Sequence, residues 1–138
     1  MSQSPIDQLL GAIDKLDVEA TMALFAPDIR LLAADGGRAA GTDAVRELLT
    51  DFLGELRSAT HEVTAQWHED DVWIAEVEGT YELKDRLRIG ALPRAFILRD
   101  GPRGIADLRV YGAHERSLGE RAGSEGRMRI GGQWMPAL

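Results

Sequence analysis

The sequence predicts a single cone-shaped α+β domain, in which short helices cover one face of a curved antiparallel sheet. Two observations lead to this prediction. Three stretches with helical periodicity come first, and four segments in which apolar and polar residues alternate follow over residues 59–114. Helices before a long meander are typical of a domain with a pocket between sheet and helices. A chain of 138 residues is large enough to bury one such core.

Two helices are expected near the N-terminus. The first begins at Pro5, because Ser4 can cap it and proline suits the first helical position. Its apolar face consists of Ile6, Leu9, Leu10, Ile13 and Leu16. The second follows the capping residue Asp17 and ends before Pro27, because a proline disfavours helical geometry in the residue before it. Its apolar residues are Val18, Met22 and Phe25.

A hairpin and a third helix are expected next. A strand is predicted over residues 29–33, and Asp35-Gly36-Gly37 favours a tight turn, because these residue types tolerate positive backbone angles. The third helix begins at residues 41–43. Its apolar stripe consists of Val45, Leu48, Leu49, Phe52 and Leu56. Charged residues on its opposite side indicate a helix that lies on a sheet.

From Ala59 onward the side-chain period is two, so alternate residues share one face of each strand. The first strand places on one face His61, Val63, Ala65 and Trp67. After a turn at residues 69–71, the second strand places on one face Trp73, Ala75, Val77, Gly79 and Tyr81. Two further strands are predicted over residues 92–99 and 105–114. Several strands carry apolar residues on both faces, so we expect helices to cover one face and a second subunit the other.

Three segments of the chain resemble the SnoaL-like proteins of the nuclear transport factor 2-like (NTF2-like) superfamily. They are Ala23-Leu24-Phe25-Ala26-Pro27-Asp28, Gly41-Thr42-Asp43-Ala44-Val45-Arg46 and Ile105-Ala106-Asp107-Leu108-Arg109-Val110-Tyr111. Residues 61–81 and Leu92-Pro93 fit the same pattern, so the resemblance predicts a SnoaL-like domain over residues 1–116 and a Gly-rich tail over residues 117–138. It implies a cone-shaped fold with three N-terminal helices packed on a curved antiparallel sheet, and frequent dimerisation through the outer sheet face. The proteins that the chain resembles include polyketide cyclases, ketosteroid isomerases, epoxide hydrolases and non-catalytic binders, which use this pocket in different ways.

The resemblance also indicates which catalytic groups of relatives are missing. Where ketosteroid isomerases hold their general-base aspartate, this chain has Ala33. Their oxyanion-hole tyrosine corresponds to Leu9, and their protonated aspartate falls near Ala95. The aspartate that often follows the final tyrosine of SnoaL-like sequences is absent after Tyr111. Without a base or donor at these positions, the steroid chemistry is not expected.

Strand phase makes His61 and Tyr81 the candidate catalytic residues. If the face that carries His61 is concave, its imidazole lies in an apolar cavity where its pKa is open to tuning. The alternative is a structural histidine that is simply hydrogen-bonded. Likewise, the aromatic residues could line a pocket or pack in the core. The residues predicted to contact a ligand are Trp73, Val77, Ala33, Ala95, Leu108, Val110 and His114.

The opposite face of the sheet is predicted to join two copies into a homodimer, because a monomer would leave several large apolar groups in water. The residues predicted for this interface are Ile74, Phe96, Leu98, Asp107, Arg109 and Tyr111. Asp107 and Arg109 could in principle form a catalytic pair. Their phase favours instead an ion pair on the outer face.

Composition narrows the possible partners. The formal net charge of -7 disfavours nucleic acid and anionic membranes. There is no cysteine, and histidines at positions 61, 68 and 114 lack the spacing of a metal site, so we expect neither metal nor cofactor. No apolar run approaches a membrane span and the N-terminus does not resemble a leader, which predicts a cytoplasmic protein. The Gly-rich tail is expected to be mobile, with an apolar end that could dock on the pocket mouth or a partner.

Two functions remain open from the sequence. The first is an enzyme that acts on a small apolar or polycyclic metabolite by acid–base chemistry, as an isomerase, cyclase or hydrolase, through His61 and Tyr81. It follows from an inner face that is mostly apolar and bears few polar groups. The second is a non-catalytic ligand-binding or dimerisation module, which follows from the missing acids. Fold alone does not decide between them.

Overall fold

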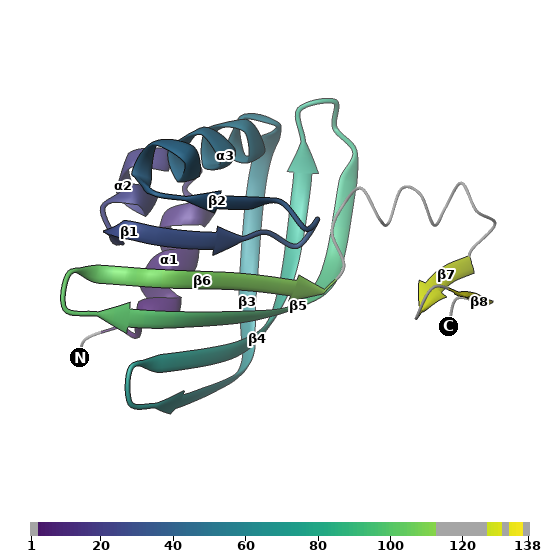
Figure 1. The fold of residues 1–138 in the computed structure, drawn as a ribbon. Helices are drawn as coiled ribbons and strands as arrows, with labels where there is room; N and C mark the ends of the chain where they lie inside the picture. The colour runs from purple at the N-terminus through teal and green to yellow at the C-terminus, as the bar shows by residue number, and fades with distance from the viewer. Residues whose placement is uncertain (1–2, 113–126, 131–132, 137–138) are drawn as a thin grey trace.

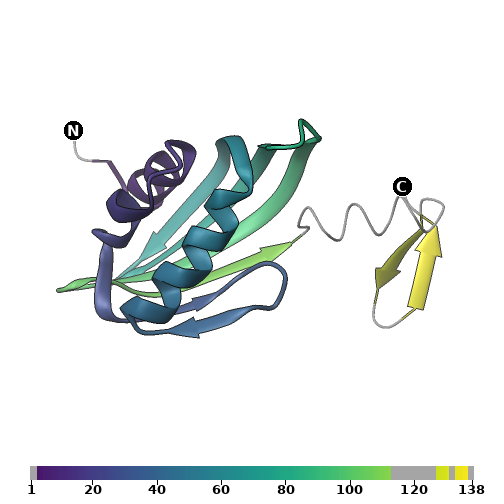
Figure 2. The same ribbon diagram turned by 90° about the horizontal axis from the view of Figure 1, so that it is seen from above.

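Three helices pack against one face of a six-stranded sheet in the computed structural model of the chain (Figures 1 and 2). The structure describes residues 3–112, 127–130 and 133–136. The strand order is β2-β1-β6-β5-β4-β3, and all neighbours are antiparallel except β1 and β6. The α+β class, with a curved and mostly antiparallel sheet, is therefore confirmed.

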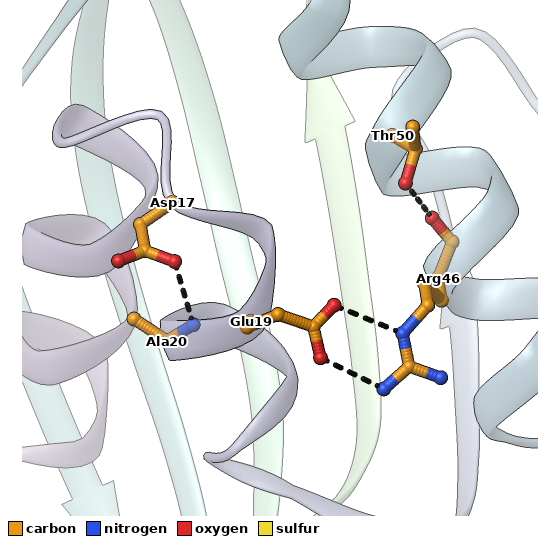
Figure 3. A network of polar contacts seen from close by, with 5 residues as sticks. All are labelled: Asp17, Glu19, Ala20, Arg46 and Thr50. Carbon is orange, nitrogen blue, oxygen red and sulfur yellow. Dashed lines mark hydrogen bonds and ion pairs between the residues drawn. The ribbon is translucent and has the colours of Figure 1, made fainter.

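The first two helices start at the predicted caps. In α1 (Pro5–Asp14) the Ser4 hydroxyl accepts a hydrogen bond from the backbone N–H of Asp7 at 3.1 Å. In α2 (Val18–Met22) the Asp17 carboxylate accepts one from the N–H of Ala20 at 2.9 Å (Figure 3). These bonds satisfy N–H groups that a helix leaves unpaired at its start.

The end of α2 was predicted too late. Phe25 belongs not to the helix but to strand β1 (Phe25–Leu32), which also contains Pro27. The register between β1 and β6 is interrupted between Phe25 and Arg30. Pro27 lies in this interruption, where its missing N–H costs the sheet no hydrogen bond.

The third helix, α3 (Thr42–Gly54), follows the hairpin formed by β1 and β2 (Arg38–Ala40). Only α1 and α2 therefore precede the sheet in the chain, which corrects the prediction of three N-terminal helices. A bidentate ion pair joins α2 and α3. The Arg46 guanidinium of α3 donates to both carboxylate oxygens of Glu19 in α2, at 3.0 and 3.1 Å (Figure 3).

The predicted meander is present and longer than expected. Its strands are β3 (Leu56–Glu69), β4 (Val72–Leu83), β5 (Arg88–Gly101) and β6 (Gly104–Gly112). The concave face of the sheet packs against the helices, and the hydrophobic core lies between the helices and this face. This core includes Ile6 and Leu9 of α1, Val45 of α3 and Val77 of β4.

A bulge in β3 changes the predicted phase of that strand. Val63 pairs with Val77, but Ala65 pairs with Glu76, so one extra residue lies between them. Beyond the bulge, Trp67 lies on the convex face with 51 % of its surface exposed. His68 pairs with Trp73 and therefore shares the concave face with His61, contrary to the simple alternation.

The predicted phase of β5 is wrong by one residue. Phe96 pairs with Ala75 and Val110 on the concave face, and both it and Leu98 are buried in the core. These two residues cannot form an outer interface. Ala95, predicted for the pocket, pairs with Glu76 and Tyr111 on the convex face instead.

The convex face carries both charges and exposed apolar groups. The Arg109 guanidinium donates to the Asp107 carboxylate at 3.1 Å, as the phase of β6 predicted. Trp67, Ile74 and Tyr111 are the large apolar residues exposed on this face among the described residues.

Part of the tail is also described. Strands β7 (Arg127–Ile130) and β8 (Gln133–Pro136) form an antiparallel hairpin in the Gly-rich tail. His114 lies outside the described residues. None of the helices in the described segments is long and apolar enough to cross a membrane.

Candidate active site

A cavity of about 530 Å³ opens between α1, α3 and the concave face of the sheet. Its size lies in the range of small-molecule sites, about 300 to 1,000 Å³. Most of its lining is apolar and comes from α1, α3, the sheet and the segment between β4 and β5: Ile13, Leu31, Leu48, Leu49, Phe52, Leu83, Leu87, Ile89, Phe96, Leu108 and Val110. The polar residues in the lining are few, so each one restricts what the cavity can do.

His61 lies in the wall of this cavity and is held by the end of α1. Its side chain is 2 % exposed. The ring atom Nδ1 lies 2.5 Å from Oδ1 of Asp14, the last residue of α1, and the backbone N–H of His61 donates to Oδ2 at 3.1 Å. Because one carboxylate binds both the ring and the main chain, the imidazole is fixed in orientation.

The second ring nitrogen of His61 faces Tyr81. Nε2 lies 2.7 Å from the Tyr81 hydroxyl oxygen, and the two rings meet edge to face at 5.3 Å between centroids. A carboxylate accepts hydrogen bonds, so Nδ1 of a neutral imidazole carries the proton and Nε2 accepts from the hydroxyl. The three side chains form one hydrogen-bonded relay, Asp14–His61–Tyr81, and Tyr81 also lines the cavity.

Burial lowers the pKa of His61 below its ordinary value, because the imidazolium would lose its hydration. The hydrogen bond to Asp14 and its negative charge act in the opposite direction and raise the pKa. The positive charge of Arg94 lowers it further. The net result favours a neutral histidine at neutral pH, which is the form that can accept a proton.

Gly79 makes the contact between His61 and Tyr81 possible. Gly79 of β4 is the register partner of His61 in β3, and it lies two residues before Tyr81. A Cβ atom at position 79 would lie 2.6 Å from the Tyr81 hydroxyl oxygen and 2.9 Å from Cζ. A Cβ atom does not approach other heavy atoms this closely, so a side chain at position 79 would displace the Tyr81 ring, and glycine lets that ring fold back along β4 to reach the imidazole.

Arg94 completes the polar part of the cavity. It lies on the concave side of β5, lines the cavity and is 9 % exposed. Its guanidinium carbon lies 4.9 Å from the centroid of the Tyr81 ring, a cation–π contact. The positive charge therefore lies next to the hydroxyl-bearing ring of the relay.

The structure brings together some of the predicted site residues and separates others. His61, Tyr81, Ala33, Leu108 and Val110 all line the cavity. The other described residues predicted for the pocket are Trp73, Val77 and Ala95, and none of them is part of the lining.

The reasons for these three corrections differ. Trp73 has the predicted phase but lies near the other end of β4, where its ring stacks on His68 with 4.0 Å between centroids. Val77 is 2 % exposed and packs in the core. Ala95 lies on the convex face, as the register of β5 requires.

Sequence reasoning missed two residues of the site. Asp14 lies 47 positions from His61 in the chain, and nothing in the pattern of α1 distinguishes it from a solvated helix end. Arg94 had a signal: it alternates with Leu92, Phe96 and Leu98, so a charge interrupts an otherwise apolar face. A charged residue in such a position is a frequent sign of a functional site.

The three groups of the relay can exchange protons with one another. No group of three or more metal-ligating side chains occurs in the part of the chain that the structure describes. A tyrosine hydroxyl at the cavity wall, a neutral histidine behind it and a carboxylate behind the histidine repeat the order of groups in known nucleophile–base–acid triads. Such a chain of groups can accept a proton at the tyrosine oxygen and stabilise the resulting imidazolium.

Solved structures share this fold at low sequence identity. One is a hypothetical protein with a ketosteroid isomerase-like fold from Catenulispora acidiphila DSM 44928, in complex with trimethylamine; it is 16% identical, with 82% of this chain and 88% of that chain covered and a TM-score of 0.72. An LEH-like epoxide hydrolase of M. tuberculosis is 15% identical, with coverage of 79% and 80% and a TM-score of 0.67.

A third similar structure is a candidate SnoaL-like polyketide cyclase from Shewanella denitrificans OS-217, which is 8% identical, with coverage of 87% and 95% and a TM-score of 0.73. At these identities the likeness shows the fold alone. No curated protein sequence matches the chain. Residues 6–105, more than half of the chain, match the model of the SnoaL-like domain, and the chain belongs to that family.

Proposed function

We propose that the protein is an enzyme that moves a proton on a small, mostly apolar molecule held in the cavity. The observation that carries the proposal is the hydrogen-bonded relay Asp14–His61–Tyr81, which ends at the wall of an apolar cavity. Tyr81 is the group that touches the substrate. His61 is its proton acceptor, and Asp14 orients the imidazole and balances its charge.

The reaction class follows from what the relay can exchange. The Tyr81 oxygen takes a proton from a substrate carbon next to a carbonyl, while the Tyr81 hydroxyl proton passes to Nε2 of His61. The electron pair of the broken C–H bond moves to the carbonyl oxygen and gives an enolate. Where a C=C bond is conjugated with the enolate, return of the proton from His61 through Tyr81 to the far carbon completes an isomerisation. Attack of the enolate on a second carbonyl instead gives an alkoxide, and transfer of the same proton to this alkoxide completes a cyclisation. The adjacent charge of Arg94 favours the anionic form of Tyr81 during the transfer.

The cavity wall supports this class over hydrolysis of polar substrates. Apolar side chains of α3 and the sheet surround the relay, and both Tyr81 and His61 are almost fully buried. Exclusion of water protects an enolate from premature protonation and strengthens the electrostatic contacts inside the site.

Hydrogen exchange at carbon tests the proposal without a known substrate. 1-Tetralone, a compact apolar ketone, would be incubated with the protein in D₂O, and loss of its α-proton signal followed by NMR. We expect the wild-type protein to accelerate this exchange and Tyr81→Phe to reduce the acceleration by about 10² to 10⁴-fold, because positioned proton transfer contributes that much.

His68→Gln serves as the control, since His68 lies at the solvent-exposed end of β3, the strand that carries His61. Equal exchange rates for wild type and Tyr81→Phe would overturn the acid–base proposal.

A non-catalytic binding protein is the second candidate. It is favoured by the absence of an acid at Ala33, which does line the cavity. In that case apolar ketones would raise the melting temperature, because they bind only the folded state, but the protein would not accelerate their exchange.

A further inference from the structure

We propose that the cavity binds the carboxylate of a small apolar acid, with Arg94 as the residue that anchors it. The inference rests on the proposed function, because this acid would be the molecule on which Tyr81 acts. It goes further by assigning a charge to the substrate.

Arg94 places a permanent positive charge on the wall of the cavity. A buried charge costs free energy unless other groups compensate for it. One such group is the Tyr81 ring, whose centroid lies 4.9 Å from the guanidinium carbon. A guanidinium has five N–H donors in a planar fork, so it can keep its present contacts and still bind a carboxylate.

Charges around the cavity separate into a positive interior and a negative mouth. The buried polar residues of the lining are His61, Tyr81 and Arg94, and only Arg94 among them is permanently charged. Asp14 is not part of the lining, and both of its oxygens are bound to His61. The charge of Arg94 also lowers the pKa of His61, after the larger effects of burial and of Asp14.

The carboxylates of the lining belong to Asp35, Asp51 and Glu55, which are all solvent-exposed. Water and salt screen exposed charges over about 8 Å at physiological ionic strength. They oppose an anion weakly, whereas the buried guanidinium attracts it in a low dielectric.

The rest of the lining defines the body of the ligand. Leu49, Phe52 and Phe96 form apolar walls next to the relay. A ring system that contacts these walls and places a carboxylate on Arg94 would also bring its ring carbons next to Tyr81. The chemical class is therefore an alicyclic or partly aromatic carboxylic acid that also carries the ketone required by the proposed proton transfer and fits a cavity of about 530 Å³.

A matched pair of probes tests this inference. 2-Naphthoate and 2-naphthamide have nearly the same shape, but only the first carries a negative charge at pH 7.5. Isothermal titration calorimetry would measure their affinities for wild type, Arg94→Met, Arg94→Lys and Arg99→Met. Arg99 is the control, because it is exposed on the convex face and pairs with Asp71.

We expect wild type and Arg99→Met to bind the naphthoate about ten- to a hundredfold more tightly than the amide, as one charge-assisted contact of about 1.5 to 3 kcal/mol implies. Arg94→Met should lose this preference and retain binding of the amide, and Arg94→Lys should keep part of the preference. Equal affinity of wild type for both probes, failure of both to bind wild type, or a preference that survives in Arg94→Met would each overturn the inference. If Arg94→Met does not fold, the relative affinity of wild type for the naphthoate and the amide still tests the inference.

The outcome is separable from that of the proposed function. A carboxylate preference that depends on Arg94, together with ketone exchange that ignores Tyr81→Phe, would keep the anion site and reject the acid–base reaction. Ketone exchange that depends on Tyr81, without any preference for the carboxylate, would keep the acid–base reaction and reject the anion site.

Discussion

His61 and His68 lie on the same strand and, because of the bulge between them, on the same face of the sheet, yet their surroundings differ. His61 is buried, with one ring nitrogen on Asp14 and the other on Tyr81. His68 is exposed, bonds the backbone oxygen of Asp70 at 2.6 Å and stacks on Trp73. The comparison shows that a position on the concave face does not by itself bury a histidine or give both ring nitrogens side-chain partners. Burial and two hydrogen-bond partners set the protonation state of His61 and its orientation.

The largest effect is expected from removing the proton acceptor. His61→Gln keeps a polar side chain of similar reach but cannot take up a proton, so ketone exchange should fall by about 10² to 10⁴-fold. His68→Gln should leave the exchange rate within about twofold of wild type, as surface substitutions outside a site usually do. Exchange rates measured by NMR for the two variants decide the comparison. Equal losses in both would mean that neither histidine is specific to the reaction.

The second-largest effect is expected from a substitution that displaces Tyr81 but removes no group of the relay. Gly79→Ala adds one methyl group, which would lie 2.6 Å from the Tyr81 hydroxyl oxygen and displace it from His61. A misplacement of this kind costs about 10²-fold in rate. Gly11→Ala is the control, because a Cβ there meets no atom within 4 Å.

The position of Tyr81 in Gly79→Ala can be followed separately from activity. The titration of His61, observed by NMR, should change in this variant because its hydrogen bond with Tyr81 is lost. An unchanged titration together with unchanged exchange would show that Gly79 is an ordinary strand residue.

The sequence was informative where local chemistry decides structure. The caps at Ser4 and Asp17 and the Asp35-Gly36-Gly37 turn were all identified correctly, because short-range hydrogen bonds and backbone angles determine them. The phases of β4 and β6 were also correct, which placed Tyr81 on the concave face and Asp107 with Arg109 on the convex face.

The errors came from long-range structure. The bulge after Val63 has no glycine or proline to mark it, so the phase of the rest of β3 could not be predicted. In β5, Arg94 shares a face with Phe96, and a charge on the buried side made the wrong phase plausible. Asp14 reaches His61 through the packing of α1 on the sheet, which no local pattern encodes.

A third, smaller effect concerns stability and pH. Burial lowers the folded-state pKa of His61 below the ordinary 6.5, so below pH 6.5 the unfolded chain binds the proton more readily than the folded chain. The contribution of neutral His61 to the free energy of unfolding is therefore fully present above pH 6.5. It is lost as the pH falls toward the folded-state pKa. Urea unfolding between pH 8 and 5 should show a steeper loss for wild type than for His61→Gln. His68→Gln should follow wild type.

Asp14→Asn sharpens this prediction. The Asp14 carboxylate raises the pKa of His61 through its hydrogen bond and its charge, so its removal should lower that pKa further. NMR titration of the His61 ring would measure the shift. A rise of the pKa in Asp14→Asn would contradict the assigned balance between burial and the carboxylate.

The last prediction concerns the convex face, where no effect on chemistry is expected. We propose that this face joins two copies of the chain, because Trp67, Ile74 and Tyr111 expose 51, 38 and 43 % of their surface there. Ile74 lies opposite both Trp67 and Ile97 in the sheet, at the centre of the apolar row. Ile74→Arg should therefore shift the protein toward monomer while ketone exchange stays unchanged.

Phe96 is unsuitable for this test, because it is buried on the concave side and a charge there would disturb the core. Light scattering at micromolar concentration gives the oligomeric state of wild type and of Ile74→Arg. A monomeric wild type would show that the exposed apolar row has no partner copy. A dimer that Ile74→Arg does not weaken would place the interface elsewhere, since an unpaired charge in an interface core costs about 2 to 5 kcal/mol. Loss of exchange upon dissociation would mean that the two faces are coupled, and the separation between a catalytic concave face and a structural convex face would no longer hold.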